Sequence, residues 1–138
     1  MAQAHEFVSN AQAQSSKPTA WLFGIEARAD GVLVGMCTLF NLAAESRRAE
    51  LGYLLDRRHW GTGLMYEATS ALLSYGFRTL QLNRVEADVD PRNLGSVRLL
   101  ERLGFVREGL LRARWIVSSE ISDSAIYGIL ASQWTNAK

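Results

Sequence analysis

The sequence is poor in the residues that build disulfides, metal centres and membrane spans. Its 138 residues include one cysteine, Cys37, and two histidines, so an internal disulfide is excluded and we expect no metal site. Cys37 lies in an apolar run that predicts a core position, and a single free thiol fits a reducing cytoplasm. Because apolar runs of about 18 residues and a secretory signal pattern are missing, we expect no membrane partner.

Neither sign of charge is in excess. The chain has 15 Lys and Arg against 14 Asp and Glu, a net charge of +1. Proteins built to hold DNA or RNA usually carry a strong basic excess, so we expect no nucleic-acid partner. Hydrophobic residues make up 48% of the chain and charged residues 21%, which is typical of a globular protein. The length predicts a single domain, residues 1–138.

Hydrophobic periodicity predicts a mixed α/β domain. Residues 1–18, rich in Ala, Gln and Ser, are predicted to be a remnant N-terminal helix and a turn. Helices are expected over 63–79 and from Asn93, a good N-cap, to Gly104, a good C-terminal stop. Strands are expected at 19–28, 32–42, 50–55, 84–90, 105–117 and 124–131, with a polar turn over 118–123.

The turn between strand 50–55 and helix 63–79 carries the most informative pattern, Arg58-His59-Trp60-Gly61-Thr62-Gly63. The first amides of a helix have no partner within it, and they form the positive end of the helix dipole. Glycines at this point let an anion approach the main chain, an arrangement that suits a diphosphate. Leu64 after the second glycine excludes a P-loop, and Tyr66 excludes the dinucleotide fingerprint.

Further motifs surround this turn in a fixed order. They are Glu50-Leu51-Gly52-Tyr53, then Glu67-Ala68 after the glycines, then Asp90-Pro91-x-Asn93-x-x-Ser96, and finally Leu103-Gly104-Phe105. Together they resemble the GNAT N-acetyltransferase superfamily, most closely its RimJ/RimL-like branch of ribosomal-protein alanine N-acetyltransferases. The resemblance implies a mostly antiparallel, twisted mixed sheet with a splayed parallel strand pair and flanking helices. It also implies transfer of an acetyl group from acetyl-CoA to a primary amine, either a protein N-terminus or a small-molecule amine.

The resemblance implies which residues bind acetyl-CoA. The diphosphate would be held by Arg58, Gly61 and Gly63, with main-chain help from His59, Trp60, Thr62 and Leu64. The acyl-pantetheine arm would lie between strands 50–55 and 84–90, in contact with Asn93. Charge that develops on the carbonyl oxygen needs a fixed donor, and a main-chain N–H from the Leu54–Leu55 region would supply it.

Acetyl transfer needs a base, because most amines are protonated near neutral pH. Glu50 begins the motif strand, where GNAT enzymes often place such a base, and the alternative is an exposed residue or an ion-pair partner of nearby arginines. Many GNAT enzymes protonate the departing thiolate with a tyrosine, which corresponds here to Leu100. The resemblance implies Ser96 as the replacement acid, although Ser96 and Asn93 also suit helix capping. Tyr53 either lines the acceptor groove or packs inward.

The start of the chain departs from the family pattern. Relatives have a first strand and one or two helices before the strand expected at 19–28, whereas 18 residues precede it here. Either the chain is truncated, or the acceptor site is more open, or a second chain completes it. A sheet without its edge strand exposes unpaired main-chain groups, so a homodimer is predicted. The competing function, suggested by the short start and by Leu100, is a non-catalytic GNAT-like module that binds acyl-CoA.

Overall fold

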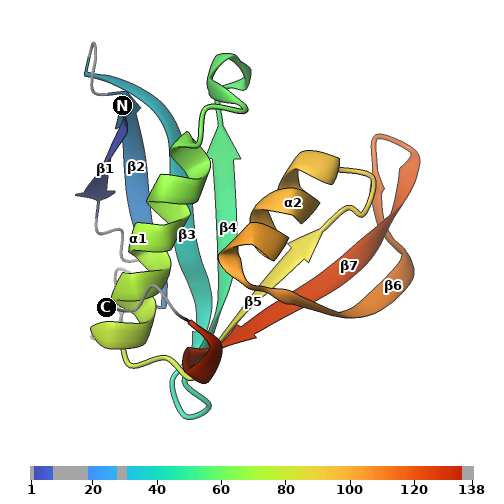
Figure 1. Ribbon diagram of the computed structural model, residues 1–138. Helices are drawn as coiled ribbons and strands as arrows, with labels where there is room; N and C mark the ends of the chain where they lie inside the picture. Colours follow the sequence, from blue (N-terminus) through green and yellow to red (C-terminus); the bar gives the residue numbers. More distant parts are fainter. Residues whose placement is uncertain (1, 8–18, 28–30, 135–138) are drawn as a thin grey trace.

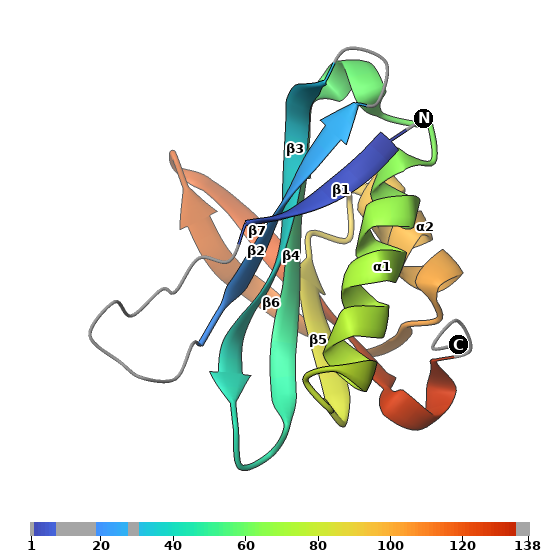
Figure 2. The same cartoon turned by 90° about the vertical axis from the view of Figure 1, so that its left-hand side faces the viewer.

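The computed structural model describes residues 2–7, 19–27 and 31–134. A twisted seven-stranded sheet has the strand order β1-β2-β3-β4-β5-β7-β6. Two helices, α1 (Leu64–Arg78) and α2 (Leu94–Leu103), lie on the same face of the sheet (Figure 1, Figure 2). The strands are β1 (Ala2–Phe7), β2 (Trp21–Ala27), β3 (Val32–Ala43), β4 (Arg48–Leu55), β5 (Arg84–Val89), β6 (Val106–Val117) and β7 (Glu120–Leu130). Two short 3-10 helices are η1 (Arg57–His59) and η2 (Ala131–Gln133).

The predicted fold class is confirmed. The chain folds into a mixed α/β domain whose neighbouring strands are antiparallel except for β4 and β5. These two strands run parallel because α1 connects them, and a parallel pair needs such a crossover.

The parallel pair is joined over a short stretch only. The pairing runs from Arg48 opposite Arg84 to Glu50 opposite Glu86 and ends there. Both strands continue, but β4 remains paired with β3 alone and β5 with β7 alone. The space between the diverging strands, which we call the wedge, opens upward in Figure 1. It is the splayed strand pair that the sequence resemblance implied.

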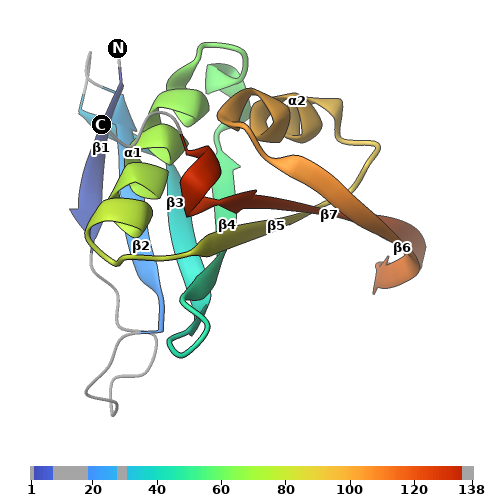
Figure 3. The ribbon, with the colours of Figure 1, turned by 60° about the horizontal axis from the view of Figure 1, so that its bottom comes forward.

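Helix α1 covers the half of the sheet that contains β2, β3 and β4. Its buried positions include Leu64, Ala68 and Leu72, which recur every four residues as the periodicity predicted. At its lower end, the Trp134 indole N–H donates to Ser74 Oγ at 3.2 Å. The segment after β7, including η2, therefore closes against the base of α1 (Figure 3).

Helix α2 covers β5 and β7, and both of its predicted ends are confirmed. Asn93 is the N-cap and accepts a hydrogen bond from the Ser96 N–H at 3.1 Å. Gly104 ends the helix with a left-handed φ of 102°. The Phe105 N–H then donates to the Leu100 carbonyl at 2.9 Å, and Leu100 is fully buried.

The helix predicted within residues 1–18 is wrong for Ala2–Phe7, which form β1, and residues 8–18 lie outside the described residues. β1 pairs with β2 along its whole length, from Ala2 opposite Ala27 to Phe7 opposite Leu22. The helical preference of such a short segment is weak, and pairing with an available strand edge overrides it. The homodimer was predicted because the sheet was expected to lack a strand beyond β2. β1 occupies that position, so this argument for a dimer no longer holds. The homodimer stays a prediction.

The turn predicted over residues 118–123 is shorter in the structure. It consists of Ser118 and Ser119, whose positive φ values of 49° and 68° suit a two-residue hairpin. Residues 120–123 already belong to β7, which begins at Glu120. Glu120 and Ile121 are both exposed, so the outer end of this hairpin has no alternation of buried and exposed residues from which a strand could be predicted.

Candidate active site

A cavity of about 300 Å³ lies in the wedge. Residues of β4 and β5 form its two walls, and the start of α2 and one residue of β3 complete it. It brings together four residues to which the sequence analysis gave candidate roles, Glu50, Tyr53, Asn93 and Ser96. The full lining is Phe40, Glu50, Leu51, Gly52, Tyr53, Ala87, Asp88, Val89, Asp90, Asn93 and Ser96.

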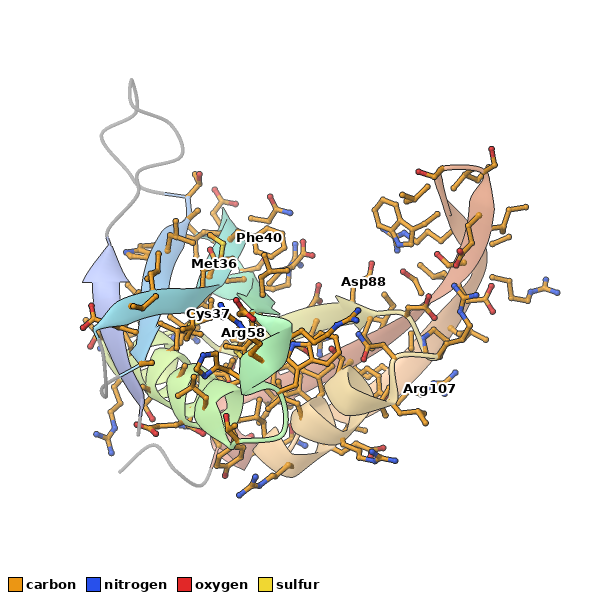
Figure 4. The ribbon with its side chains drawn as sticks, turned by 90° about the horizontal axis from the view of Figure 1, so that it is seen from above. Met36, Cys37, Phe40, Arg58, Asp88 and Arg107 are labelled. Atoms are coloured by element: carbon orange, nitrogen blue, oxygen red, sulfur yellow. The ribbon has the colours of Figure 1, made fainter. Side chains whose placement is uncertain are left out.

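The cavity is lined by residues that belong to both faces of the sheet. Side chains alternate along a strand, so Leu51 and Tyr53 point to the helix face and Glu50 points to the opposite face. The structure places Phe40 and Asp88 on the face away from the helices (Figure 4).

The Glu50 carboxylate is held in place by a neighbouring strand. Its Oε2 accepts a hydrogen bond from the Asn41 side-chain amide at 2.9 Å. Asn41 has a left-handed φ of 52° and lies at a register irregularity of β3. The ion pair weighed as an alternative, with Arg47 or Arg48, is not formed among the described residues.

The side chains of Tyr53 and Ser96 both line the cavity and lie beside each other. This contact joins β4 to the first turn of α2, at a level where β4 and β5 no longer pair. Burial raises the pKa of the Tyr53 phenol, and the neighbouring Ser96 side chain partly offsets that effect. Tyr53 therefore packs inward, which was one of the two alternatives from the sequence, and it also lines the cavity; a place in the acceptor groove stays a prediction.

A second carboxylate, Asp88, lines the cavity and was not selected from the sequence. Its Oδ1 accepts a hydrogen bond from the hydroxyl of Ser124, which is fully buried. Ser124 in turn accepts from the Trp115 indole N–H at 2.9 Å. The alternation of Glu86, Asp88 and Asp90 with apolar residues predicted only that β5 has a polar face, and nothing in the sequence distinguished Asp88 from its neighbours.

Three carboxylates line the cavity, and Glu50 and Asp88 differ from Asp90 and from nearby Glu86 in their partners. Arg84 pairs with Glu86 at 2.8 Å and also with Glu108. Arg92 pairs with Asp90 at 2.7 Å. Within the described ranges, neither Glu50 nor Asp88 has a cationic partner. The negative charge that faces the cavity is therefore not neutralised by the protein, and it favours a cationic ligand.

The edge of β4 that faces β5 presents main-chain donors to the wedge. The Asp56 N–H donates to the Val34 carbonyl at 2.7 Å, which shows that even-numbered residues of this strand direct their amides to β3. Alternation then directs the amides of Tyr53 and Leu55 to the opposite edge, beyond the last pair with β5. Of the predicted Leu54–Leu55 region, Leu55 is the residue whose N–H faces the wedge.

The glycine turn leads from the end of β4 to α1. Gly61 and Gly63 have left-handed φ values of 74° and 82°, which side chains other than glycine rarely adopt. A Cβ atom at either position would meet no described atom within 4 Å, so the surface above the turn is open. Gly63 is the N-cap of α1 and supplies no side-chain cap.

The amides of this turn fall into two groups. Those of Arg58, His59 and Trp60 donate within the turn, to Asp56 and Arg57. Within the described part of the chain, the amides of Gly61, Thr62, Gly63 and Leu64 make no hydrogen bond. The amides of His59 and Trp60, predicted to help hold a diphosphate, are therefore already in use within the turn. The second group is the one that is open to an anion.

The remaining side chains of the turn are held by local contacts. The Arg58 guanidinium makes two bonds to the Asp56 carboxylate, at 3.2 and 3.0 Å, and lowers the pKa of Asp56 to about 2. The Trp60 indole N–H donates to the Leu55 carbonyl at 2.9 Å. Arg58 stays on the exposed side of the turn, above the end of β4 (Figure 4).

The arrangement fits coenzyme A. Its pantetheine arm is an extended chain with two amide groups, and it can pair with the free edge of β4 as an added strand would. Its diphosphate would then reach the open amides at the start of α1. Within the described residues, no group of three or more metal-ligating side chains is found, and no helix is long and apolar enough to cross a membrane.

Comparisons with known proteins agree with this site. The family model of the acetyltransferase (GNAT) domain matches residues 1–106. An N-acetyltransferase named p20 from Bacillus licheniformis is 35% identical over 97% of this chain and 75% of its own length. The [ribosomal protein uS5]-alanine N-acetyltransferase of Escherichia coli is 30% identical, over 85% of this chain and 61% of the enzyme. A variant of the spermidine N-acetyltransferase SpeG from Vibrio cholerae superposes with a TM-score of 0.80 at 26% identity, covering 88% of this chain and 71% of that protein.

The chain belongs to the GNAT acetyltransferase family. The family predicted from the sequence is thus confirmed, and so is the class of activity, transfer of an acetyl group from acetyl-CoA to an amine. The chain spans about 60% to 75% of the length of the curated relatives that it matches.

Proposed function

We propose that this chain transfers the acetyl group of acetyl-CoA directly to a small cationic primary amine, with Glu50 as the base. The observation that carries the proposal is the cavity in the wedge, which is lined from both faces of the sheet and by Glu50, Asn93 and Ser96. The donor enters along the helix face, and the acceptor amine enters from the bare face. Direct attack then needs no covalent enzyme intermediate.

The donor is held by main-chain groups of two segments. The amides of Gly61, Thr62, Gly63 and Leu64 bind the diphosphate, and the Arg58 guanidinium adds positive charge beside it. The amides of Tyr53 and Leu55 face the pantetheine arm. One of them donates to the thioester carbonyl oxygen, where negative charge develops during attack. Asn93 caps α2 with its side-chain oxygen, which leaves its NH₂ group to contact the arm.

The acceptor is activated on the other side of the wedge. Glu50, held by Asn41, takes a proton from the ammonium group, directly or through one water, and frees the lone pair that attacks the thioester. Asp88 supplies a second negative charge in the same cavity. Two carboxylates without cationic partners favour an acceptor that carries a second positive charge over a neutral amine or a singly charged one. A peptide N-terminus is the competing acceptor.

A panel of acceptors tests the proposal. Acetyl-CoA consumption is measured with spermidine, putrescine, a monoamine and a peptide that begins with alanine. We expect turnover with the diamine or polyamine, and we expect Glu50→Gln to lower kcat at least 100-fold while calorimetric affinity for coenzyme A is kept. Glu45→Gln, which removes an exposed carboxylate from the turn before β4, is the matched control.

Each outcome of this panel has a definite meaning. Equal kcat/KM values for spermidine, putrescine and the monoamine would contradict the role given to the carboxylates of Glu50 and Asp88. Tight binding of coenzyme A without transfer to any amine would instead support the non-catalytic module. The homodimer and the cytoplasmic location stay predictions, and light scattering at micromolar concentration tests the first of them.

A further inference from the structure

A row of hydrogen bonds runs across the sheet from its outermost strand to the wedge. The Trp115 indole N–H on β6 donates to the hydroxyl of Ser124 on β7 at 2.9 Å, and that hydroxyl donates to Asp88 Oδ1 on β5. Ser124 is fully buried, and Asp88 lines the cavity. The row therefore connects the hairpin of β6 and β7 to the candidate active site.

The register of the strands explains why these three side chains meet. Trp115 pairs with Ser122. Asp88 pairs with Ile126. Each therefore lies diagonally across from Ser124, which is two positions away from either partner along β7, and residues two apart on a strand share a face. It is the face away from the helices, on which Asp88 lies (Figure 4).

The chemistry of the three groups fixes the direction of both hydrogen bonds. An indole N–H can only donate, so the Ser124 oxygen accepts from Trp115. The single proton of the hydroxyl is then directed to Asp88, which accepts it as a carboxylate. A neutral donor holds the carboxylate in place without cancelling its charge. Within the described residues, the second oxygen of Asp88, Oδ2, makes no hydrogen bond, so it is available to a ligand.

Glu50 and Asp88 are each held from the side away from the wedge. Asn41 on β3 holds Glu50. Ser124 on β7 holds Asp88, so the two donors lie on opposite sides of the β4–β5 pair. Glu50 is opposite Glu86, which places Asp88 diagonally across from it. Such neighbours are about 7–8 Å apart in a regular sheet, and here the strands diverge. The two carboxylates therefore suit two positive charges joined by a short chain better than a single charge.

We propose that Asp88 binds the ammonium group of the acceptor that does not react, and that Ser124 and Trp115 are positioning residues that hold Asp88 for this purpose. This inference rests on the proposed function. Glu50 takes the proton of the reacting ammonium group, while Asp88 keeps its ion pair with the other one throughout the reaction. Selectivity for an acceptor with two charges then depends on side chains of β6 and β7 that do not line the cavity.

Putrescine and n-butylamine test the role of Asp88, because they have the same carbon chain and differ by one ammonium group. We measure kcat/KM for both acceptors in the unmodified chain and in Asp88→Asn, which keeps the shape of the side chain and removes its charge. The value for putrescine is expected to fall about 10- to 100-fold, the effect of one charge-assisted contact, and that for n-butylamine to stay within about threefold. The loss is expected in KM and not in kcat, because such a contact is equally strong in the ground state and the transition state.

Asp123→Asn is the matched control for this change. Asp123 lies on β7 outside the cavity, and its Oδ1 accepts the Ala113 N–H at 2.7 Å. Asparagine keeps an acceptor for that N–H and removes the same charge. Both kcat/KM values should stay unchanged. If the control loses putrescine activity to the same extent as Asp88→Asn, the effect comes from net charge and the inference is overturned.

Variants of the other two residues test the positioning role. Ser124→Ala removes the donor to Asp88, and Trp115→Phe removes only the indole N–H at a position that is 47% exposed. Each is expected to raise KM for putrescine about 3- to 10-fold and to leave n-butylamine unchanged. In an Asp88→Asn background, neither should add more than about twofold, because both act through Asp88. Ser122→Ala, on the same strand and face, is the control and should keep both values.

Calorimetry measures binding of the acceptor without turnover. The chain is saturated with coenzyme A, which has no acetyl group to transfer, and putrescine is titrated into it. The affinity is expected to be highest in the unmodified chain, lower in Ser124→Ala and Trp115→Phe, and lowest in Asp88→Asn. Equal affinities in all four proteins would overturn the inference. Circular dichroism checks that each variant folds, and Trp115→Phe decides on the positioning role if Ser124→Ala does not.

The failures of the two proposals are distinguishable. If the unmodified chain acetylates amines and Glu50→Gln does not, but Asp88→Asn keeps the preference for putrescine, the inference is refuted and transfer with Glu50 as the base stands. Folded Ser124→Ala and Trp115→Phe variants that keep the full preference would refute the positioning role, and so would multiplicative losses in the double variants. If the unmodified chain transfers to no amine, the proposed function fails, and the inference fails with it.

Discussion

The two helices begin in opposite ways, although each follows a strand that borders the wedge. Helix α2 begins after Asn93, whose side-chain oxygen accepts a hydrogen bond from the Ser96 N–H at 3.1 Å. Helix α1 begins at Gly63, which has no side chain to cap it and a left-handed φ of 82°. One helix satisfies its first donors with its own residue, and the other leaves them for a ligand. This difference separates a structural helix start from an anion-binding one.

The uncapped start has an energetic cost that the rest of α1 offsets. A good side-chain cap typically contributes about 1 kcal/mol to helix stability, and α1 lacks it. Its 15 residues include seven buried ones, among them the fully buried Leu72 and Leu73. Each fully buried leucine contributes roughly 1.5 to 3 kcal/mol, so burial dominates the stability of this helix. The start of α1 is thus free to serve a ligand.

The largest effect is expected when α1 is given a cap. Gly63→Asp places a carboxylate at the start of α1. This carboxylate accepts hydrogen bonds from the open amides and repels a diphosphate. We expect affinity for coenzyme A to fall about 100-fold or more, which corresponds to about 2.7 kcal/mol. Isothermal titration calorimetry measures this loss.

Gly63→Ala is the matched control for this change. Alanine introduces the same left-handed strain, worth roughly 1–2 kcal/mol of stability, but no negative charge. Its affinity for coenzyme A should fall by less than 10-fold. If the alanine and aspartate variants lose the same affinity, the effect comes from strain, and the electrostatic account of the turn is wrong.

A smaller effect is expected when α2 loses its cap. Asn93→Ala leaves the Ser96 N–H without its partner and should destabilise the fold by about 1 kcal/mol, which lowers the melting temperature by roughly 3–6 °C. Asn93→Asp keeps an acceptor at the helix start and should retain the stability. Thermal unfolding followed by circular dichroism measures both variants. An unchanged melting temperature in Asn93→Ala would show that the cap is not structural.

The smallest effect is expected when a thiol reagent is added to the native protein. The single thiol, Cys37, lies in the closed region beneath α1 and not in the open wedge. Cys37 is fully buried on β3, and burial raises the pKa of its thiol to about 12. We expect a thiol reagent such as Ellman's reagent to leave the native protein unmodified at pH 8 and to react completely in denaturant. Rapid stoichiometric reaction of the native protein would show that the sheet opens beneath α1.

Most of the secondary structure could be predicted because its signals are local. Asn93 and Gly104 mark the ends of α2, and the four-residue repeat of Leu64, Ala68 and Leu72 marks α1. Ala2–Phe7 could not be predicted as a strand, because its conformation depends on pairing with β2, which is distant in sequence. The outer hairpin of β6 and β7 was misplaced because both faces of it are exposed.

The candidate site was predictable where a motif marks it and not elsewhere. Glu50, Asn93 and Ser96 lie in motifs, and the structure collects them in one cavity. Asp88 has no such signal, because only the register of β5 against β7 brings it to the buried Ser124. The sequence also could not distinguish which amides of the glycine turn are open, since this depends on the hydrogen bonds of η1.

Nuclear magnetic resonance tests the central claim most directly. The amide signals of a ¹⁵N-labelled sample are followed while coenzyme A is added. The account predicts that the signals of Gly61, Thr62, Gly63 and Leu64 shift together and saturate at the stoichiometric point, while those of β2 stay unchanged. Saturable binding of coenzyme A that leaves these four signals in place would contradict it.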